Sequence, residues 1–221
     1  MNILIPPRKV FGRNVLASCR ALGRARHRMH VLCASRRFLG TQKALTSKYC
    51  LEYGYWPDPM KTPEASTEAV AAYCREHDID LVIAHSDSVA ATLSYYKDRI
   101  PARVAEPDYT IFTNGVDKCQ TICSAEKLGV PAPRTIECHT VDGVLADMQQ
   151  RGIDFPVVVK PKVRGDGVLS RAAIVETEDD LRIKCEQLAS FGKPEPIHDY
   201  EYPLVQECIS VELYDCCTLG N

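Results

Sequence analysis

The stretch FPVVVKPKVRGDGV, residues 155–168, decides how the rest of the chain is interpreted. Three consecutive valines lead into Lys160, and a loop that contains Gly165 and Gly167 follows. An apolar run that enters a glycine-containing loop is typical of a buried strand and the turn after it. Glycine lets backbone N–H groups approach an anion, and a lysine at a strand end adds a point charge. The stretch predicts a polyphosphate-binding strand and loop, but an ordinary exposed basic hairpin has the same pattern.

The spacing differs from two common phosphate-binding motifs. In G-x-x-x-x-G-K-[ST] the lysine comes after the glycines, whereas Lys160 comes before them. G-x-G-x-x-G is also missing, both here and between the first predicted strand and helix. A nicotinamide-binding oxidoreductase therefore lacks its main support in this sequence.

Composition and charge exclude several classes of function. The 221 residues are 45% hydrophobic and 25% charged, which indicates a globular protein of one large or two small domains. A formal net charge of −2 gives no electrostatic basis for binding nucleic acid or a membrane surface. No apolar run approaches the roughly 20 residues that span a bilayer. We expect a cytoplasmic protein with no nucleic-acid and no membrane partner.

The 11 cysteines indicate a reducing compartment. Their number is odd and they lie in periodic segments, unlike a secreted disulfide framework. Cys119 and Cys123 share a helix face, and Cys216 and Cys217 are neighbours, but neither pair makes a zinc-binding C-x-x-C. We expect the six histidines to be structural or solvated: His27, His30, His77, His85, His139 and His198.

The first half of the chain alternates strands and helices. Predicted strands cover residues 2–6, 30–33 and 80–84, and predicted helices cover residues 14–22, 62–77 and 86–97. The first strand, helix and strand form a βαβ unit, which predicts a parallel sheet. Thr62 and Pro63 mark a helix start. His85, Ser86 and Asp87 follow a strand end, where α/β sheets bind ligands and where a plain helix cap is the simpler role.

The α/β pattern ends near residues 107–113. Further on, predicted helices cover residues 114–128, 141–150 and 177–190, and predicted strands cover residues 134–136, 155–160, 172–175, 203–208 and 211–217. Gly129 supplies the position after the first of these helices, and prolines prevent its continuation. Thr177 begins the last helix, with three acidic residues in its first turn.

Four segments of the second half occur in a characteristic order. They are DK at residues 117–118, LGVPAPRT at 128–135, FPVVVKP with its loop at 155–167, and LVQECI at 204–209. Together they resemble the ATP-grasp superfamily, which includes the biotin carboxylase, carbamoyl-phosphate synthetase and D-alanine–D-alanine ligase families. ALGRARHRMHV at residues 21–31 and SKY at 47–49 are similar to the small domain that precedes the ATP-binding part. The resemblance covers nearly the whole chain.

The resemblance implies an α/β fold with three parts. A Rossmann-like pre-ATP-grasp domain would cover residues 1–112, a small α+β lid subdomain residues 113–205, and the start of a C-terminal ATP-grasp subdomain residues 206–221. The family's final domain and its Mg²⁺ ligands, an acidic pair and an asparagine, would lie downstream. We therefore expect a truncated chain or fragment that has no turnover by itself, with no catalytic and no metal-binding residue of its own.

The resemblance also implies which residues bind the phosphates of ATP. Lys160 would bind them from the end of its strand, and Lys118 would be a second ligand. Gly165, Asp166 and Gly167 would form the loop that closes over them. A site that excludes water needs such lysines to balance the phosphate charge.

A second group of residues would hold the nucleoside. Glu207 would lie in the hinge beside the adenine, and the backbones of Cys208 and Ile209 would supply its hydrogen bonds. Glu212 would contact the ribose. ATP and Mg²⁺ are therefore the expected cofactors, although the Mg²⁺ ligands would lie outside this chain.

For the full-length protein the resemblance implies an ATP-dependent carboxylate–amine ligase. In such enzymes ATP phosphorylates a carboxylate and a nucleophile attacks the acyl phosphate, while Mg²⁺ and lysines offset the developing charge. The implied partners are small-molecule carboxylate and amine substrates, and a homodimer is a possible assembly. A non-catalytic nucleotide-binding or regulatory module is the alternative.

Overall fold

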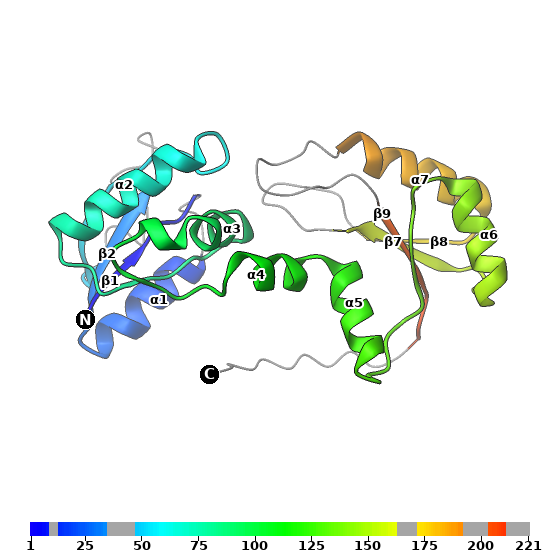
Figure 1. Cartoon of the computed structure of the whole chain (residues 1–221), viewed down its shortest axis with the longest axis horizontal. Helices are drawn as coiled ribbons and strands as arrows, with labels where there is room; N and C mark the ends of the chain where they lie inside the picture. Colours follow the sequence, from blue (N-terminus) through cyan, green and yellow to red (C-terminus); the bar gives the residue numbers. More distant parts are fainter. Residues whose placement is uncertain (9–12, 35–46, 163–171, 192–202, 211–221) are drawn as a thin grey trace. The chain divides into compact units, whose positions relative to one another are not determined.

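The computed structural model describes residues 1–8, 13–34, 47–162, 172–191 and 203–210 (Figure 1). These residues divide into two compact units. The first contains the described residues up to Thr121, and the second contains those from Ile122 onward. None of the helices in the described ranges combines the length and the apolar character that a membrane crossing requires.

The first unit is built on a parallel sheet. Its described strands are β1 (Asn2–Ile5), β2 (Arg28–Cys33), β3 (Cys50–Tyr55), β4 (Leu81–Val82) and β5 (Arg103–Val104). They lie in the order β3-β2-β1-β4-β5, and every neighbouring pair is parallel. This is the strand order of a doubly wound Rossmann-like sheet. The predicted βαβ unit is confirmed, because β1 and β2 pair in parallel and one helix connects them in the sequence.

Helices cover both faces of this sheet. They are α1 (Arg13–Arg24), α2 (Pro63–Glu76), α3 (Asp87–Tyr95) and α4 (Tyr109–Val116), with a short 3₁₀ helix, η2 (Lys97–Arg99). Ile3 and Ile5 pack with Val15 of α1, whereas Leu4 packs with Val70 of α2. Successive side chains of a strand point to opposite faces, so β1 contributes to both cores. Figure 1 shows α1 and α2 on opposite sides of β1 and β2.

The second unit is built on an antiparallel sheet. Its described strands are β6 (Thr135–Glu137), β7 (Val157–Pro161), β8 (Ala173–Val175) and β9 (Pro203–Glu207), in the order β6-β9-β7-β8. All three pairs are antiparallel. The strands match the predicted ones to within a few residues at each end. The predicted strand at residues 211–217 lies outside the described residues.

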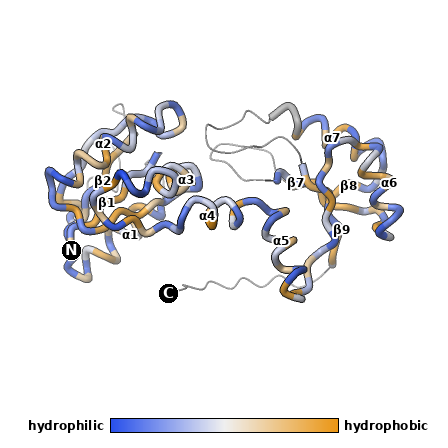
Figure 2. Tube along the Cα trace, in the orientation of Figure 1, coloured by the Kyte–Doolittle hydropathy of each residue, from blue (hydrophilic) through white to orange (hydrophobic). Residues whose placement is uncertain are grey.

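Two helices cover one face of the antiparallel sheet. They are α6 (Val141–Arg151) and α7 (Glu178–Phe191). Val157 and Val159 pack with Val144 of α6 and Leu181 of α7 in a single core. Hydrophobic and hydrophilic residues alternate along α6 and α7 (Figure 2). The alternation within β7 therefore directs Lys160 to the opposite sheet face, which these helices leave uncovered.

Two sequence signals for helix ends are confirmed. Gly129 has φ +70°, and its N–H and that of Val130 donate to the carbonyls of Glu126 (3.0 Å) and Ala125 (2.9 Å). This is the Schellman arrangement, in which a glycine adopts the left-handed conformation after the last helical turn. At the start of α7, Thr177 Oγ1 accepts a hydrogen bond from the N–H of Asp180 (3.2 Å).

The single predicted helix over residues 114–128 is wrong. The chain forms two helices there, α4 and α5 (Lys118–Lys127), separated at Asp117. Asp117 has φ −77° and ψ 110°, and its carboxylate accepts hydrogen bonds from the N–H groups of Cys119 (2.8 Å) and Gln120 (3.2 Å). An aspartate in this role begins a new helix instead of continuing the old one. The last parallel strand, β5, ends at Val104, and α4 packs on α3 through Phe112, so the α/β pattern ends with α4, close to the expected residues 107–113.

Candidate functional site

The predicted site residues fall into three groups in the structure. Lys160 lies on β7 and Glu207 ends β9, and Cys208 and Ile209 follow Glu207 directly. Lys118 is the first residue of α5 and lies in the first unit. The remaining four lie outside the described residues: Gly165, Asp166, Gly167 and Glu212.

Lys160 is held by a polar chain across three strands. Its Nζ donates to Oε1 of Gln206 on β9 at 2.6 Å. The Nε2 group of Gln206 donates to Oγ1 of Thr135 on β6 at 2.7 Å, and this hydroxyl donates to the carbonyl of Pro133 at 2.9 Å. Gln206 is only 8% exposed, so its amide is aligned by these two partners. This series of hydrogen bonds fixes the Lys160 ammonium on the sheet face that α6 and α7 leave uncovered.

The charge of Lys160 is not balanced within the described part of the chain. Its acceptor is a neutral amide, and no carboxylate of a described residue lies within ion-pair distance of it. Burial lowers the pKa of Lys160, because the half-buried ammonium has lost part of its water. A bound anion would restore that balance and would gain a charge-assisted hydrogen bond.

Lys162, two residues further on, has a different environment. Its Nζ lies 2.7 Å from Oε1 of Glu137 on β6, and both side chains are about one-quarter exposed. The carboxylate already compensates this ammonium. Of the two lysines at this strand end, Lys160 is therefore the better candidate for binding an anion.

Glu207, the last residue of β9, binds Arg134, which directly precedes β6. Its Oε1 accepts a hydrogen bond from the backbone N–H of Arg134 at 2.7 Å, and its Oε2 accepts one from the guanidinium Nε at 2.6 Å. The backbone hydrogen bond, and then the guanidinium, hold the pKa of Glu207 below its usual range. Arg134 also donates to the carbonyls of Arg151 (2.7 Å) and Gly152 (2.8 Å). These contacts position the backbone that continues into Cys208 and Ile209.

The sequence did not indicate the Gln206 and Arg134 contacts. They depend on strand register, since β6 and β7 both pair with β9, and Gln206 lies opposite Thr135 and Val158. One signal was present. A glutamine inside the apolar run PLVQ is a polar side chain that a buried strand must satisfy with hydrogen bonds.

Lys118 follows the capping residue Asp117 and is partly buried in the first turn of α5. The side chain of Asp117 is engaged by the N–H groups of that turn. The predicted role of Lys118 as a second phosphate ligand stays a prediction.

The residues after β4 have structural roles. His85 Nε2 lies 2.7 Å from Oγ of Ser18, and its Nδ1 lies 2.8 Å from the carbonyl of Ala84. Ser86 occupies the N-cap position of α3, but its hydroxyl makes no capping hydrogen bond and instead lies 3.4 Å from Oγ of Ser88. The expected helix cap at Ser86 or Asp87 is confirmed in position at Ser86, without a capping hydrogen bond from its hydroxyl.

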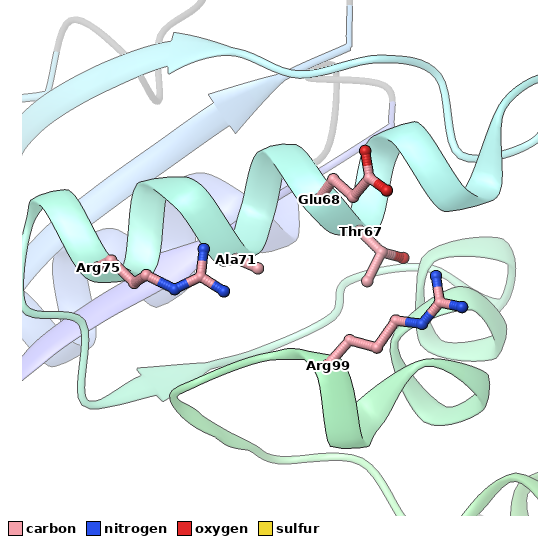
Figure 3. A pocket seen from close by; sticks show the side chains of 5 residues that line it. All are labelled: Thr67, Glu68, Ala71, Arg75 and Arg99. Atoms are coloured by element: carbon pink, nitrogen blue, oxygen red, sulfur yellow. The ribbon is translucent and has the colours of Figure 1, made fainter.

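A surface pocket of about 440 Å³ lies between α2 and η2 in the first unit (Figure 3). Its lining residues are Thr67, Glu68, Ala71, Arg75 and Arg99. Two arginines and one carboxylate give it a mixed charge. None of the predicted nucleotide-binding residues lines it.

Comparison with known proteins gives matches among solved structures only. No protein-family model matches the sequence, and no curated protein matches it. The L-amino acid ligase from Bacillus licheniformis is 16% identical with a TM-score of 0.66, and the match covers 94% of this chain and 44% of that one. The biotin carboxylase domain of Hydrogenobacter thermophilus 2-oxoglutarate carboxylase, solved with MgADP, ADP and bicarbonate, is 15% identical with a TM-score of 0.68 and the same coverage.

A third match is the carboxyaminoimidazole ribonucleotide synthase from Aspergillus clavatus, solved with ATP. It is 15% identical with a TM-score of 0.66, and the match covers 94% of this chain and 47% of that one. Identities this low show the fold, and the fold is that of the N-terminal portion of ATP-grasp ligases. The predicted fold class is confirmed: α/β, with a Rossmann-like parallel sheet followed by a small antiparallel sheet. The chain spans less than half the length of the structures that it matches.

Proposed function

We propose that this chain is the N-terminal part of an ATP-dependent carboxylate–amine ligase and supplies the lid side of its nucleotide site. The observation that carries the proposal is the ammonium of Lys160. It lies on the sheet face opposite α6 and α7, is oriented by Gln206, and has no carboxylate partner among the described residues. The fold likeness to an L-amino acid ligase and to a synthase solved with ATP supports the same reading.

The described residues fit an adenine nucleotide in two respects. Lys160 would hold a phosphate oxygen, and Val158, which lies two residues earlier on the same face, offers an apolar surface to the purine. The backbone of Cys208 and Ile209 would hydrogen-bond the adenine beyond the end of β9. The contacts between Glu207 and Arg134 would keep that backbone in place. Lys118, the loop at residues 165–167 and Glu212 complete the proposed site.

Bound ATP would supply the phosphoryl group that activates a substrate carboxylate for attack by an amine. The part of this chain would be to bind and orient the phosphates and to offset their charge, since phosphoryl transfer depends mainly on positioning and electrostatics. Beside Lys160, the described residues contain no group of three side chains that could hold Mg²⁺. Those residues do not fit the ion, and we place its ligands elsewhere in the full-length protein.

The second candidate is a non-catalytic nucleotide-binding or regulatory module. Binding of ATP without ligase turnover by the full-length protein would distinguish it. The domain bounds at residues 1–112, 113–205 and 206–221 belong to the proposal. So do small-molecule carboxylate and amine substrates, a cytoplasmic location and a homodimer.

The test is the affinity of the full-length protein for ATP, measured by isothermal titration calorimetry. Lys160→Ala removes a charge-assisted hydrogen bond, so we expect a loss of about 10-fold to 100-fold. Lys184→Ala is the matched control, because it makes the same chemical change on α7, on the helix-covered side of the sheet. An unchanged affinity in Lys160→Ala would contradict the proposal.

A further inference from the structure

A cluster of two histidines, a glutamate and a tyrosine lies in the first unit and contains none of the proposed nucleotide-binding residues. It consists of His30 on β2, Glu52 on β3, Tyr73 on α2, and His77 at the C-cap of α2. None of these side chains has a role in the proposed nucleotide site. The sequence predicted both histidines to be structural or solvated, because the six histidines are dispersed along the chain.

The fold brings the four residues together. His30 and Glu52 are register partners on neighbouring parallel strands. Tyr73 and His77 are four residues apart, so they lie on one side of α2, and their rings stack at 4.0 Å between centroids. The ring of His30 lies 5.8 Å from that of Tyr73 and 5.6 Å from that of His77. The helix end and the two strands therefore converge on one point.

Three donor atoms in this cluster have the spacing of metal ligands. Glu52 Oε2 lies 2.9 Å from His77 Nδ1 and 4.0 Å from His30 Nδ1, and the three donor atoms all lie within 4.8 Å of one another. Zinc–ligand bonds of about 2.0–2.2 Å in a tetrahedron place neighbouring ligand atoms about 3.3 Å apart. The side chains of Glu52 and His77 are 51% and 23% exposed, so both are free to adjust around an ion and to admit it from solvent.

His30 is the buried member of this cluster. The residue is 3% exposed, its Nδ1 lies 3.1 Å from the Tyr73 hydroxyl, and its buried Nε2 has no hydrogen-bond partner among the described residues. The Nδ1 atom is the ring nitrogen on the side of Glu52, 4.0 Å from Oε2. An ion bound to Nδ1 would leave the proton on Nε2, so the spacing of the three donor atoms, and not the unpartnered Nε2, indicates a metal site.

We propose that His30, Glu52 and His77 bind a divalent transition-metal ion of the Zn²⁺ type. The ligands would be the two Nδ1 atoms and a carboxylate oxygen, with water or the neighbouring Tyr73 hydroxyl completing the coordination. Imidazole and carboxylate are both ordinary zinc ligands, whereas Mg²⁺ prefers oxygen alone. Because the ligands come from β2, β3 and the end of α2, the ion would fasten β3, the outermost described strand on that side of the sheet, to the helix beside it.

The test is a titration of the full chain with Zn²⁺ and with Co²⁺ under reducing conditions, followed by calorimetry and by the visible absorption of Co²⁺. Absorption by Co²⁺ separates nitrogen and oxygen ligands from thiolates, which matters in a chain with 11 cysteines. Glu52→Gln and His77→Gln change the two more exposed ligands, so they are less disruptive than a substitution of buried His30. His27→Gln is the matched control, because it changes a histidine of the same unit outside the cluster.

We expect wild type and His27→Gln to bind one ion through nitrogen and oxygen ligands and to unfold at higher temperature when Zn²⁺ is present. We expect Glu52→Gln and His77→Gln to lose at least about tenfold in affinity and to lose that thermal shift. Equal affinity in all four proteins, a thiolate-type spectrum alone, or no binding by wild type would each overturn the proposal. In those cases the cluster is an ion pair and an aromatic stack only.

Discussion

The substitution Gln206→Glu tests whether the Lys160 ammonium must lack an ion-pair partner within the protein in order to bind a phosphate. It keeps the length of the side chain and the acceptor that lies 2.6 Å from Lys160 Nζ, but it makes that acceptor a carboxylate. The Lys160 ammonium would then have an ion-pair partner within the protein. Its second oxygen replaces the Nε2 donor, so the Thr135 hydroxyl must turn from the carbonyl of Pro133 to donate to the new carboxylate. We expect this variant to fold with somewhat lower stability, and to bind ATP more weakly.

Two terms set the size of the effect. A hydrogen bond to a charged group contributes about 1 kcal/mol more than a neutral one, so a phosphate must displace a stronger partner. Repulsion between the added carboxylate and a nearby phosphate opposes binding as well, by an amount of the same order in a partly exposed site. A combined loss of about 1.5–3 kcal/mol corresponds to about a 10-fold to 100-fold weaker affinity.

The assay is calorimetric titration of the full-length variant with ATP, together with thermal unfolding. Gln150→Glu adds the same charge on an exposed position of α6 and is the control. The expected result is cooperative unfolding of both variants, which shows that both are folded, and weak binding for Gln206→Glu alone. Unchanged or tighter ATP binding by Gln206→Glu would refute the reasoning that the uncompensated ammonium of Lys160 holds a phosphate.

Two further predictions concern stability. Gly23→Ala would place a Cβ atom 2.6 Å from Cβ of Tyr49, so overpacking should lower the free energy of unfolding in urea by about 1–3 kcal/mol. Gly115→Ala is the control, because its Cβ meets no atom within 4 Å and should not destabilise the protein. Equal stability of the two variants would contradict the packing at Gly23. Arg134→Gln should destabilise the protein at pH 7, because the Arg134 guanidinium, after the backbone N–H that the variant keeps, helps to lower the pKa of Glu207. The difference from wild type should shrink as pH falls through the lowered folded-state pKa of Glu207, and a pH-independent difference in the free energy of unfolding would contradict this assignment.

Much of the fold was predictable because its signals are local. The apolar runs of β1, β2 and β7 identify buried strands, and Gly129 and Thr177 mark helix ends through their own backbone and hydroxyl chemistry. β3 and β5 were missed. β5 has two residues, too few for a pattern, and β3 is mostly exposed without alternation. These strands form because neighbouring strands pair with them, which a local pattern does not contain.

The candidate site was predictable in part for the same reason. Lys160 stands out because it ends an apolar run before a glycine loop, and the resemblance then assigns it to a phosphate. The amide of Gln206 and the pairing of Arg134 with Glu207 depend on how β6, β7 and β9 align, 46 and 73 residues apart along the chain. The cluster of His30, Glu52 and His77 likewise depends on three separate elements.

The most direct test of the central claim is an experimental structure of the full-length protein with an adenine nucleotide bound. The account predicts Lys160 Nζ about 2.7–3.2 Å from a phosphate oxygen, with the Gln206 amide still beside it, and the adenine against the backbone of Cys208 and Ile209. A nucleotide bound elsewhere, or a Lys160 side chain turned away from the phosphates, would contradict it.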